Sequence, residues 1–282
     1  MPELPEVETM CRGIGDVIGQ TIVSVATPRR TRRPSPISPP PRRLATELLG
    51  QRIEAIERVG KRAVLHLRPS RASASARLVI EPRMTGLLLR VPPPTEQHVR
   101  LIVEFQAGGP PLTFWDRRGL GTIRLLDAAT FATRCGPPLI GPDALSLRGD
   151  WLYEAIHASQ RSIKVALLDQ RVTAGIGNIY AAEILFAAGV DPRSRCCRLS
   201  RAVCDSLARH CRRILQRAIR LEGSSIGDET YRTADNRPGR FQRCHQVYGQ
   251  TDAACPRCGA TIRRIVQAQR STWFCPGCQR RR

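Results

Sequence analysis

Apolar positions near the start of the chain recur at the spacing of a helix. Leu4, Val7, Cys11, Ile14 and Ile18 lie three or four residues apart, which places them on one face of an α-helix. A proline and two glutamates in the same segment suit the first helical turn, where the helix dipole favours negative charge. We therefore expect a first helix whose apolar face contributes to a core.

Short β-rich runs follow this helix, separated by clusters of proline and glycine. They are Thr21–Ala26, Ala63–Leu67, Arg77–Ile80, Leu87–Val91, Val99–Phe105, Leu112–Phe114 and Gly121–Leu125. Many short strands with a single helix predict a β-sandwich or barrel. Between two of these runs Pro28–Arg43 is basic and proline-rich, and we expect it to be an exposed loop.

The pattern changes to helical periodicity in the second half of the chain, after a glycine- and proline-rich linker at 135–150. The predicted helices are Trp151–Ser159, Ile163–Leu168, Asn178–Ala188 and Arg201–Leu221. The expected fold class is therefore α+β and multidomain. Its parts are an N-terminal β-sandwich with an N-terminal helix at 1–134, the linker, a helical domain at 151–240 and a C-terminal domain at 241–282.

Charge narrows the class of partner. The 282 residues carry a formal net charge of +21, and such a field favours polyanions, although a genome biased towards arginine codons is an alternative explanation. Only Lys61 and Lys164 are lysine among 45 basic residues, and lysine enters tight sites that arginine does not fit. We find no candidate membrane span or signal peptide, and an odd count of 11 cysteines fits a reducing cytosol.

Two pairs of cysteines have the spacing of a metal site. Cys255 and Cys258 are followed, after sixteen residues, by Cys275 and Cys278, which is typical of a four-cysteine zinc ribbon with one structural Zn²⁺. The stretch from Cys255 to the end holds seven arginines and no acidic residue. A ribbon with this charge is expected to lie against phosphates, which alone indicates at least a DNA- or RNA-binding module.

The chain start suggests chemistry. Removal of Met1 leaves a secondary amine on Pro2, with an ordinary pKa of about 8, so that a useful fraction is a neutral nucleophile. The adjacent Glu3 is placed to shuttle protons. Taken alone, Pro-Glu at a helix start is also ordinary capping composition.

These pieces together resemble the formamidopyrimidine-DNA glycosylase family over nearly the whole chain. The similar segments are the PELPEVE start, Gly60-Lys61, PRMTG at 82–86, DRRGLG at 116–121, GIGNIYAAE at 175–183, VYG at 247–249 and AQRSTWFC at 268–275. The resemblance implies a bacterial base-excision repair enzyme, a bifunctional glycosylase and abasic-site lyase. It also implies that damaged double-stranded DNA is the partner, that the helical domain is of the helix–two-turn–helix type, and that the protein is a cytoplasmic, nucleoid-associated monomer.

Site roles follow from the resemblance residue by residue. Pro2 is the implied nucleophile, Glu3 the acid–base partner and Lys61 a lysine on a β-hairpin beside the lesion phosphate. The implied DNA-binding residues are Glu6, Met84, His98, Arg118, Leu120, Lys164, Asn178 and Arg270. A polar, glycine-rich segment at 223–241 is the implied lesion-capping lid, with a plain surface loop as the alternative, and the loop at 28–43 is a DNA contact or a solvated tether.

The sequence departs from the family pattern where a side chain fills the gap left by an extruded base. Leu120 stands where the family commonly has phenylalanine, and Gly119 where another arginine is usual. A leucine wedges between bases but does not stack as an aromatic ring does, so recognition of the opposite base is left open.

Two alternative functions remain. One is the sister endonuclease VIII type, which favours oxidised pyrimidines; Leu4 argues against it, since that group usually has glycine there. The other is a catalytically silent DNA-binding paralogue, against which the simultaneous presence of Pro2, Glu3, Lys61, Asn178 and Arg270 argues. The leading hypothesis is excision of 8-oxoguanine and formamidopyrimidines.

Overall fold

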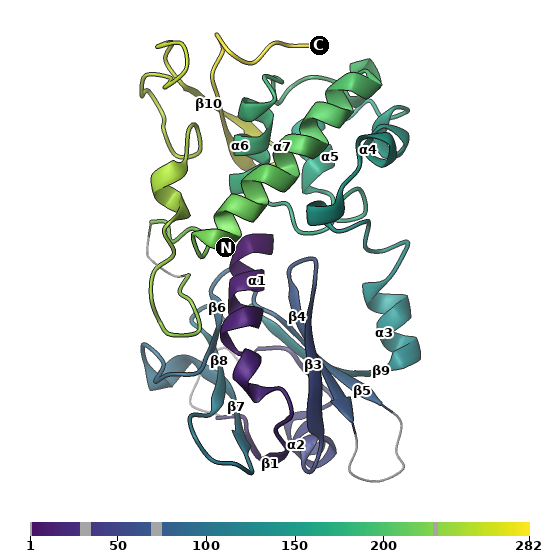
Figure 1. The fold of residues 1–282 in the computed structure, drawn as a ribbon, viewed down its shortest axis with the longest axis vertical. Helices are drawn as coiled ribbons and strands as arrows, with labels where there is room; N and C mark the ends of the chain where they lie inside the picture. The colour runs from purple at the N-terminus through teal and green to yellow at the C-terminus, as the bar shows by residue number, and fades with distance from the viewer. Residues whose placement is uncertain (1, 29–34, 69–74, 228–230) are drawn as a thin grey trace. The chain divides into compact units, whose positions relative to one another are not determined.

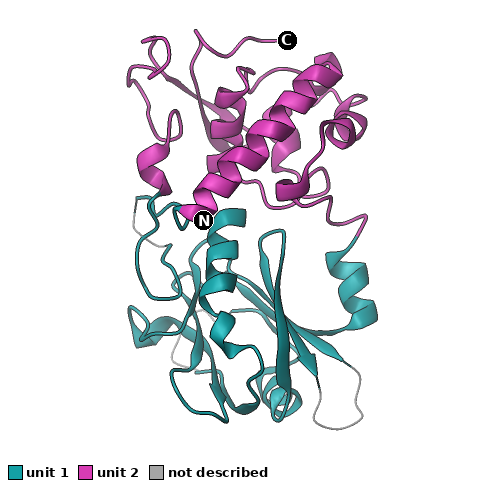
Figure 2. Cartoon of the chain, in the orientation of Figure 1, with its two compact units in different colours: residues 1–136, 221–240 teal, residues 137–220, 241–282 magenta. Residues whose placement is uncertain are grey.

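The computed structural model describes residues 2–28, 35–68, 75–227 and 231–282. The chain forms two compact units, residues 1–136 with 221–240, and residues 137–220 with 241–282 (Figure 2). The segment 221–240, which contains most of the expected lid, thus belongs to the first unit. None of the helices in the described ranges is long and apolar enough to cross a membrane.

In its described residues the first unit is built from two sheets and three α-helices (Figure 1). The helices are α1 (Leu4–Gly13), α2 (Pro41–Leu48) and α3 (Ala128–Cys135). The strands are β1 (Ile22–Ala26), β2 (Ile37–Ser38), β3 (Arg52–Val59), β4 (Arg62–Arg68), β5 (Ala76–Glu81), β6 (Gly86–Leu89), β7 (Val99–Phe105), β8 (Leu112–Asp116) and β9 (Thr122–Asp127). One sheet has the order β1-β7-β8-β6 and the other β2-β9-β5-β4-β3, which confirms the predicted sandwich.

A single apolar core joins these sheets and α1. Leu65 and Leu78 from the five-stranded sheet, Phe114 from the four-stranded sheet, and Val7 and Met10 from α1 are all at most 1% exposed. Along β3 only Ile53 is buried, whereas β6 and β8 are buried throughout. Burial of Leu4, Val7, Cys11 and Ile14 explains the predicted periodicity. The fifth predicted position, Ile18, lies beyond the end of α1 and is 47% exposed.

The prediction of a single helix in this unit was wrong. Leu44 and Leu48 lie one turn apart and are fully buried, so α2 forms within and just after the proline-rich segment, with Pro41 at its first position. Asp127 caps α3 by accepting a hydrogen bond from the Thr130 amide at 2.8 Å. The expectation of a continuous loop at 28–43 also fails, because β2 pairs in parallel with β9; residues 29–34 lie outside the described part.

The second unit is helical with a terminal hairpin. Its helices are α4 (Gly149–Ile156), α5 (Ile163–Leu168), α6 (Asn178–Ala187) and α7 (Arg201–Arg220), and its strands are β10 (Arg263–Gln267) and β11 (Arg270–Phe274). Among the described residues, five short 3₁₀ helices accompany these elements: Ala144–Ser146, Cys196–Arg198 and Phe241–Cys244 here, and Gly15–Val17 and Glu96–His98 in the first unit. Helix α6 is buried along almost its whole length and packs on both α7 and the ribbon, so it is the centre of this unit.

Candidate active site and metal centre

The start of α1 is buried and its backbone is held by the Glu6 side chain. Pro2 is buried, and Glu3 and Glu6 are each 1% exposed. Glu6 Oε2 accepts a hydrogen bond from the Glu3 amide at 2.9 Å, while Oε1 accepts one from the Ser224 amide at 2.8 Å. Hydrogen bonds to a buried carboxylate are stronger than those between neutral groups, so this arrangement fixes the residue that follows Pro2.

The turn that meets Glu6 requires a glycine. Gly223 has φ +77°, and a Cβ atom there would lie 2.8 Å from Glu6 Oε1, a separation that real side chains do not adopt. Tyr231 lies in the same region and donates a hydrogen bond to the Glu222 carbonyl at 3.0 Å. Burial, followed by the nearby Glu6 carboxylate, raises the pKa of Tyr231 well above its ordinary value. The described part of the expected lid thus contacts the start of α1; residues 228–230 lie outside it.

Lys61 lies at the tip of the β3–β4 hairpin, which is linked to α1 by an ion pair. The two-residue turn places Gly60 at φ +59° and Lys61 beside it, half-buried. Arg58 donates from Nε to Glu8 Oε2 at 2.9 Å and from Nη1 to the Gly60 carbonyl at 3.0 Å. One guanidinium therefore holds both the helix that carries Glu3 and the turn that carries Lys61.

The side chains expected to fill the DNA gap lie on two loops that a buried carboxylate joins. Asp116 is fully buried and accepts hydrogen bonds from the Thr85 hydroxyl, the Arg118 amide (3.2 Å) and the Gly121 amide (2.7 Å). Thr85 in turn accepts one from the Arg118 amide at 3.0 Å. Exposed Met84 and Arg118 flank this network.

Leu120 lies inside the same loop as Arg118 and is half-buried. Gly119, one residue earlier, has φ +63°, a conformation that arginine, the residue expected there from the resemblance, would adopt only under strain. The glycine at this position therefore fits the turn that the structure adopts. His98 packs edge-on against Trp115, with the two ring centroids 5.4 Å apart. Its pKa is lowered by burial and then by Arg100 and Arg117.

The remaining predicted DNA-binding residues belong to the second unit, where two of them hold the β10–β11 hairpin. Lys164 is fully buried, and its Nζ donates to the Ser271 carbonyl at 3.0 Å and to Thr272 Oγ1 at 2.5 Å. Asn178 Nδ2 donates to the same carbonyl at 3.0 Å, and its Oδ1 is buried without a partner among the described residues. Lys164 therefore positions strand β11 of the hairpin through Ser271 and Thr272. A direct contact between Lys164 and DNA stays a prediction.

Arg270 stands exposed at the end of this hairpin, next to a strained turn. Ala268 and Gln269 both have positive φ, +46° and +61°, and non-glycine residues in this region cost about 1–2 kcal/mol each. Such strain persists only where surrounding contacts determine the backbone, and it is frequent at functional sites. The bonds from Lys164 and Asn178 to Ser271 supply those contacts beside Arg270.

The four cysteines predicted to bind metal are brought together. Their Sγ atoms all lie within 4.8 Å of one another, with Cys255 and Cys278 at 3.8 Å and Cys258 and Cys275 at 3.4 Å. A tetrahedral Zn²⁺ with Zn–S bonds of about 2.3 Å separates its sulfurs by roughly 3.8 Å. The donor set and its spacing therefore fit zinc.

Comparison with known proteins decides the family. Family models match residues 1–123 (formamidopyrimidine-DNA glycosylase N-terminal domain), 140–230 (formamidopyrimidine-DNA glycosylase H2TH domain) and 254–281 (zinc finger found in FPG and IleRS). The formamidopyrimidine-DNA glycosylase of Cereibacter sphaeroides is 37% identical over 291 residues, covering 99% of this chain and 100% of that protein. The chain belongs to the formamidopyrimidine-DNA glycosylase family.

Solved structures of family members share the whole fold. A Lactococcus lactis variant crystallised with DNA that contains Fapy-dG has a TM-score of 0.86 and 34% identity, and covers 99% of this chain and 100% of that chain. The wild-type Lactococcus lactis enzyme, crystallised with DNA that contains an oxidised pyrimidine, has a TM-score of 0.85 and 33% identity at the same coverage. This chain is accordingly a DNA repair glycosylase, and its cysteine cluster is the site of one structural zinc ion.

The structure groups the predicted residues of this glycosylase into two sets. One surrounds the start of α1 and the loops of the first unit, and the other surrounds the hairpin of the second. Sequence reasoning missed the residues that hold these sets, namely Arg58, Thr85, Asp116, Gly223 and Ser224. Thr85 and Asp116 lie inside the PRMTG and DRRGLG motifs, and Gly223 and Ser224 lie in the expected lid, but Arg58 lies in none of these segments. The contacts that these residues make show no signal in one sequence, because their partners are distant along the chain.

We predict that Arg58 acts on catalysis through Lys61. Arg58→Met removes the bonds to Glu8 and Gly60, and the loss of charged hydrogen bonds worth about 1–3 kcal/mol is expected to slow single-turnover excision roughly 10–100-fold. Arg12→Met is the matched control, because Arg12 pairs with the same Glu8 carboxylate at 2.8 Å from an exposed position. Equal rates for both variants would contradict this role.

Zinc removal tests the metal centre. Cys258→Ser is expected to release zinc, to disorder the hairpin that carries Arg270 and to weaken binding of duplex DNA roughly tenfold or more. Metal analysis and a DNA-binding titration measure both effects, with exposed Cys197→Ser as the control outside the cluster. Full DNA affinity in a protein shown to contain no zinc would overturn the structural role.

Proposed function

We propose that this glycosylase excises oxidised purines, 8-oxoguanine and formamidopyrimidines, from duplex DNA and then cleaves the abasic site. The observation that carries the proposal is the buried chain start, in which Glu6 fixes the backbone beside Pro2 through the Glu3 amide. Without such contacts the first residues of a chain are usually poorly ordered, and a nucleophile there would have no fixed position. The relative that binds Fapy-dG DNA supports the substrate class.

Pro2 performs both chemical steps in this proposal. After Met1 is removed, the Pro2 nitrogen attacks C1′ of the damaged nucleotide, a C–N bond forms, and the glycosidic bond breaks as the base leaves with a proton. Glu3 supplies the proton that opens the sugar ring at its oxygen. The resulting iminium acidifies the C2′ proton, whose loss expels the 3′ phosphate. The conjugated iminium that remains acidifies the C4′ proton, whose loss expels the 5′ phosphate.

The other predicted residues bind and extrude the nucleotide. Met84, Arg118 and Leu120 enter the gap left by the lesion base, at an unstacking cost of a few kcal/mol. Lys61, Asn178 and Arg270 contact phosphates, with Asn178 at the start of α6, where backbone amides favour an anion. Lys164 supports the hairpin that presents Arg270. We further propose that the enzyme acts as a monomer in the bacterial cytoplasm, in association with the nucleoid.

Excision of oxidised pyrimidines is the second candidate function. A solved relative was crystallised with DNA that contains an oxidised pyrimidine, so the family site admits such lesions at least as ligands. Cleavage of duplexes that contain 8-oxoguanine, formamidopyrimidine or thymine glycol, each opposite all four bases, separates the two candidates. Faster excision of thymine glycol than of either purine lesion would reverse our preference.

We predict that Leu120 enters the gap left by the extruded base, where it has no aromatic ring to stack on the neighbouring bases. Because base–aromatic stacking is worth about 1–3 kcal/mol, Leu120→Phe is expected to tighten binding of a lesion duplex, and Leu120→Ala to weaken it. Fluorescence titration with a non-cleavable abasic duplex measures both affinities. If the two variants bind and cleave like the parent, the position is not a wedge.

The Pro2 mechanism predicts a covalent adduct. Borohydride reduces the iminium during turnover, and the mass of the digested product should place DNA on the peptide that begins at Pro2. A protein that retains Met1 has its Pro2 nitrogen in an amide, whose lone pair is delocalised, and should bind lesion DNA without cutting it. Adduct formation at Lys61 or Lys164, or normal cutting with Met1 retained, would disprove the proline mechanism.

A further inference from the structure

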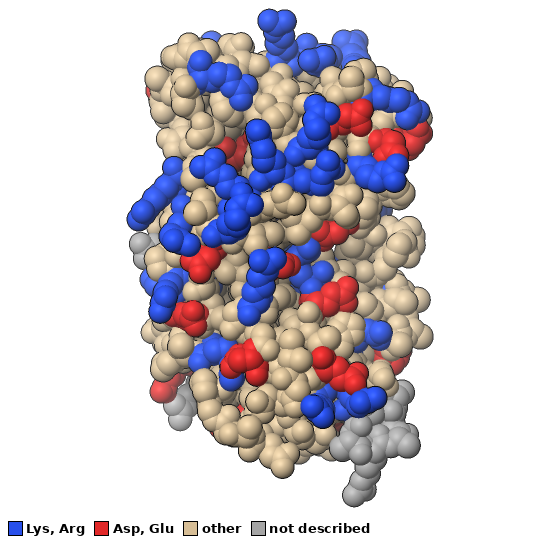
Figure 3. All heavy atoms as spheres, in the orientation of Figure 1, with Lys and Arg blue, Asp and Glu red and all other residues tan. Residues whose placement is uncertain are grey.

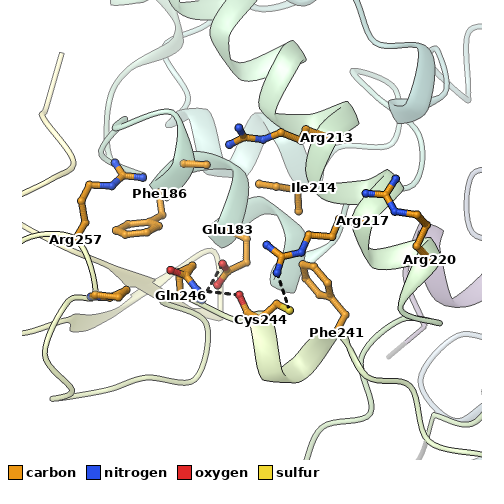
Figure 4. Close-up of a pocket in the computed structure, with 12 residues that line it drawn as sticks. Glu183, Phe186, Arg213, Ile214, Arg217, Arg220, Phe241, Cys244, Gln246 and Arg257 are labelled. Atoms are coloured by element: carbon orange, nitrogen blue, oxygen red, sulfur yellow. Dashed lines mark hydrogen bonds between the residues drawn. The ribbon is translucent and has the colours of Figure 1, made fainter.

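A recessed pocket in the second unit is lined by four arginines. Arg213, Arg217 and Arg220 come from α7, and Arg257 comes from the turn between Cys255 and Cys258, which we call the first zinc knuckle. They surround a cavity of 630 Å³ (Figure 4). Its remaining walls come from α6, from α7 and from residues that follow α7: Glu183, Phe186, Ala187, Ile214, Phe241, Cys244, Gln246 and Pro256. The cavity has the size of a small-ligand site.

In the described part of the chain these arginines form no ion pair with a carboxylate. Among the described residues none of the four pairs with a carboxylate; Arg217 donates to Cys244 Sγ at 3.3 Å and Arg257 stacks 4.4 Å from the Phe186 ring centroid. The single lining carboxylate, Glu183, is 3% exposed and accepts hydrogen bonds from the backbone amides of residues 246, 247 and 248 at 2.9–3.0 Å. The carboxylate oxygens of Glu183 therefore bond backbone amides, and they form no ion pair with the four guanidinium groups.

The positive potential acts on a neighbouring side chain. The pKa of His210 is lowered, first by burial and then by Arg213, Arg209 and Arg257. Arginine side chains also gather along α7 on the face that Figure 3 shows. Like charges held this close favour a bound anion, and planar guanidinium forks match phosphate oxygens in pairs.

The pocket differs from the predicted phosphate contacts of this unit. Lys164, Asn178 and Arg270 contribute none of its lining. The pocket involves the second half of α6 and the knuckle, whereas those residues belong to α5, the first position of α6 and the β10–β11 hairpin. An anion held here therefore uses a separate set of residues.

We propose that this pocket binds a phosphoryl anion, with Arg213 and Arg217 as the principal ligands. The shared chemistry is a phosphate group, presented either by a free phosphorylated molecule or by a DNA backbone outside the predicted contacts. The proposal is independent of the excision chemistry, because it involves none of the residues assigned to that chemistry.

Calorimetric titration of the zinc-loaded, full-length protein with pyrophosphate at low salt tests the proposal. The double variant Arg213→Gln/Arg217→Gln is expected to bind pyrophosphate at least tenfold more weakly than the parent. The control is Arg198→Gln/Arg195→Gln, which removes the same charge from exposed positions of this unit outside the pocket. Thermal unfolding of all three proteins checks that they fold alike.

The outcomes divide clearly. A loss confined to the pocket variant supports the site, whereas equal pyrophosphate binding by both variants, or none by the parent, overturns it. Affinity for an undamaged duplex then distinguishes the sources: an equal loss for the pocket variant identifies the DNA backbone, and unchanged duplex affinity identifies a free phosphorylated molecule. In both of these cases excision of a lesion at saturating enzyme is expected to remain at the parent rate.

Discussion

Glu6 uses both carboxylate oxygens to fix the beginning of the chain, one on the Glu3 amide and one on the Ser224 amide. Chain termini are normally the least ordered part of a domain, yet the proposed nucleophile is the residue before Glu3. A buried carboxylate is costly unless its oxygens are hydrogen-bonded, so the two amides and the carboxylate require one another. Gly223 leaves the space that this contact needs.

Buried polar groups hold irregular backbone elsewhere in the molecule by the same physics. Asp116 joins two loops of the first unit, and Lys164 and Asn178 share the Ser271 carbonyl. Glu183 accepts hydrogen bonds from three consecutive backbone amides, in the segment that leads into the ribbon. Burial raises the pKa of Glu183, and the amides act in the opposite direction. In each case removal of the side chain would leave buried donors or acceptors unsatisfied, a loss of about 1–3 kcal/mol each.

The elements that the sequence predicts well have strong local signals. Apolar periodicity identifies α5, α6 and α7 closely, and the paired cysteines identify the zinc site. It also identifies the start of α1, but that helix ends at Gly13, before the last predicted position, Ile18. Strand β3 was missed because its exposed face is rich in charge, and α2 because two leucines are a weak pattern beside a run of prolines. The chemistry of the chain start came from resemblance, since Pro-Glu is ordinary at a helix start.

Contacts between distant residues were out of reach of any local pattern. Ser224 meets Glu6 across more than two hundred residues, and Ser271 meets Lys164 across more than one hundred. Periodicity specifies which face of a helix is buried, but the partner of a particular polar atom depends on the packed fold. The positions of Pro2, Lys61 and Arg270 were therefore predictable as members of motifs, whereas the residues that hold them were not.

Single-turnover excision by Glu6→Gln measures the role of Glu6 most directly. A glutamine presents only one oxygen, so one of the two amides must face an N–H group, and the chain start should lose its fixed position. We expect excision and borohydride trapping to fall together by roughly 10–100-fold, while affinity for a non-cleavable abasic duplex and zinc content stay near those of the parent. Excision at the parent rate by Glu6→Gln would show that the chain start is held by other means.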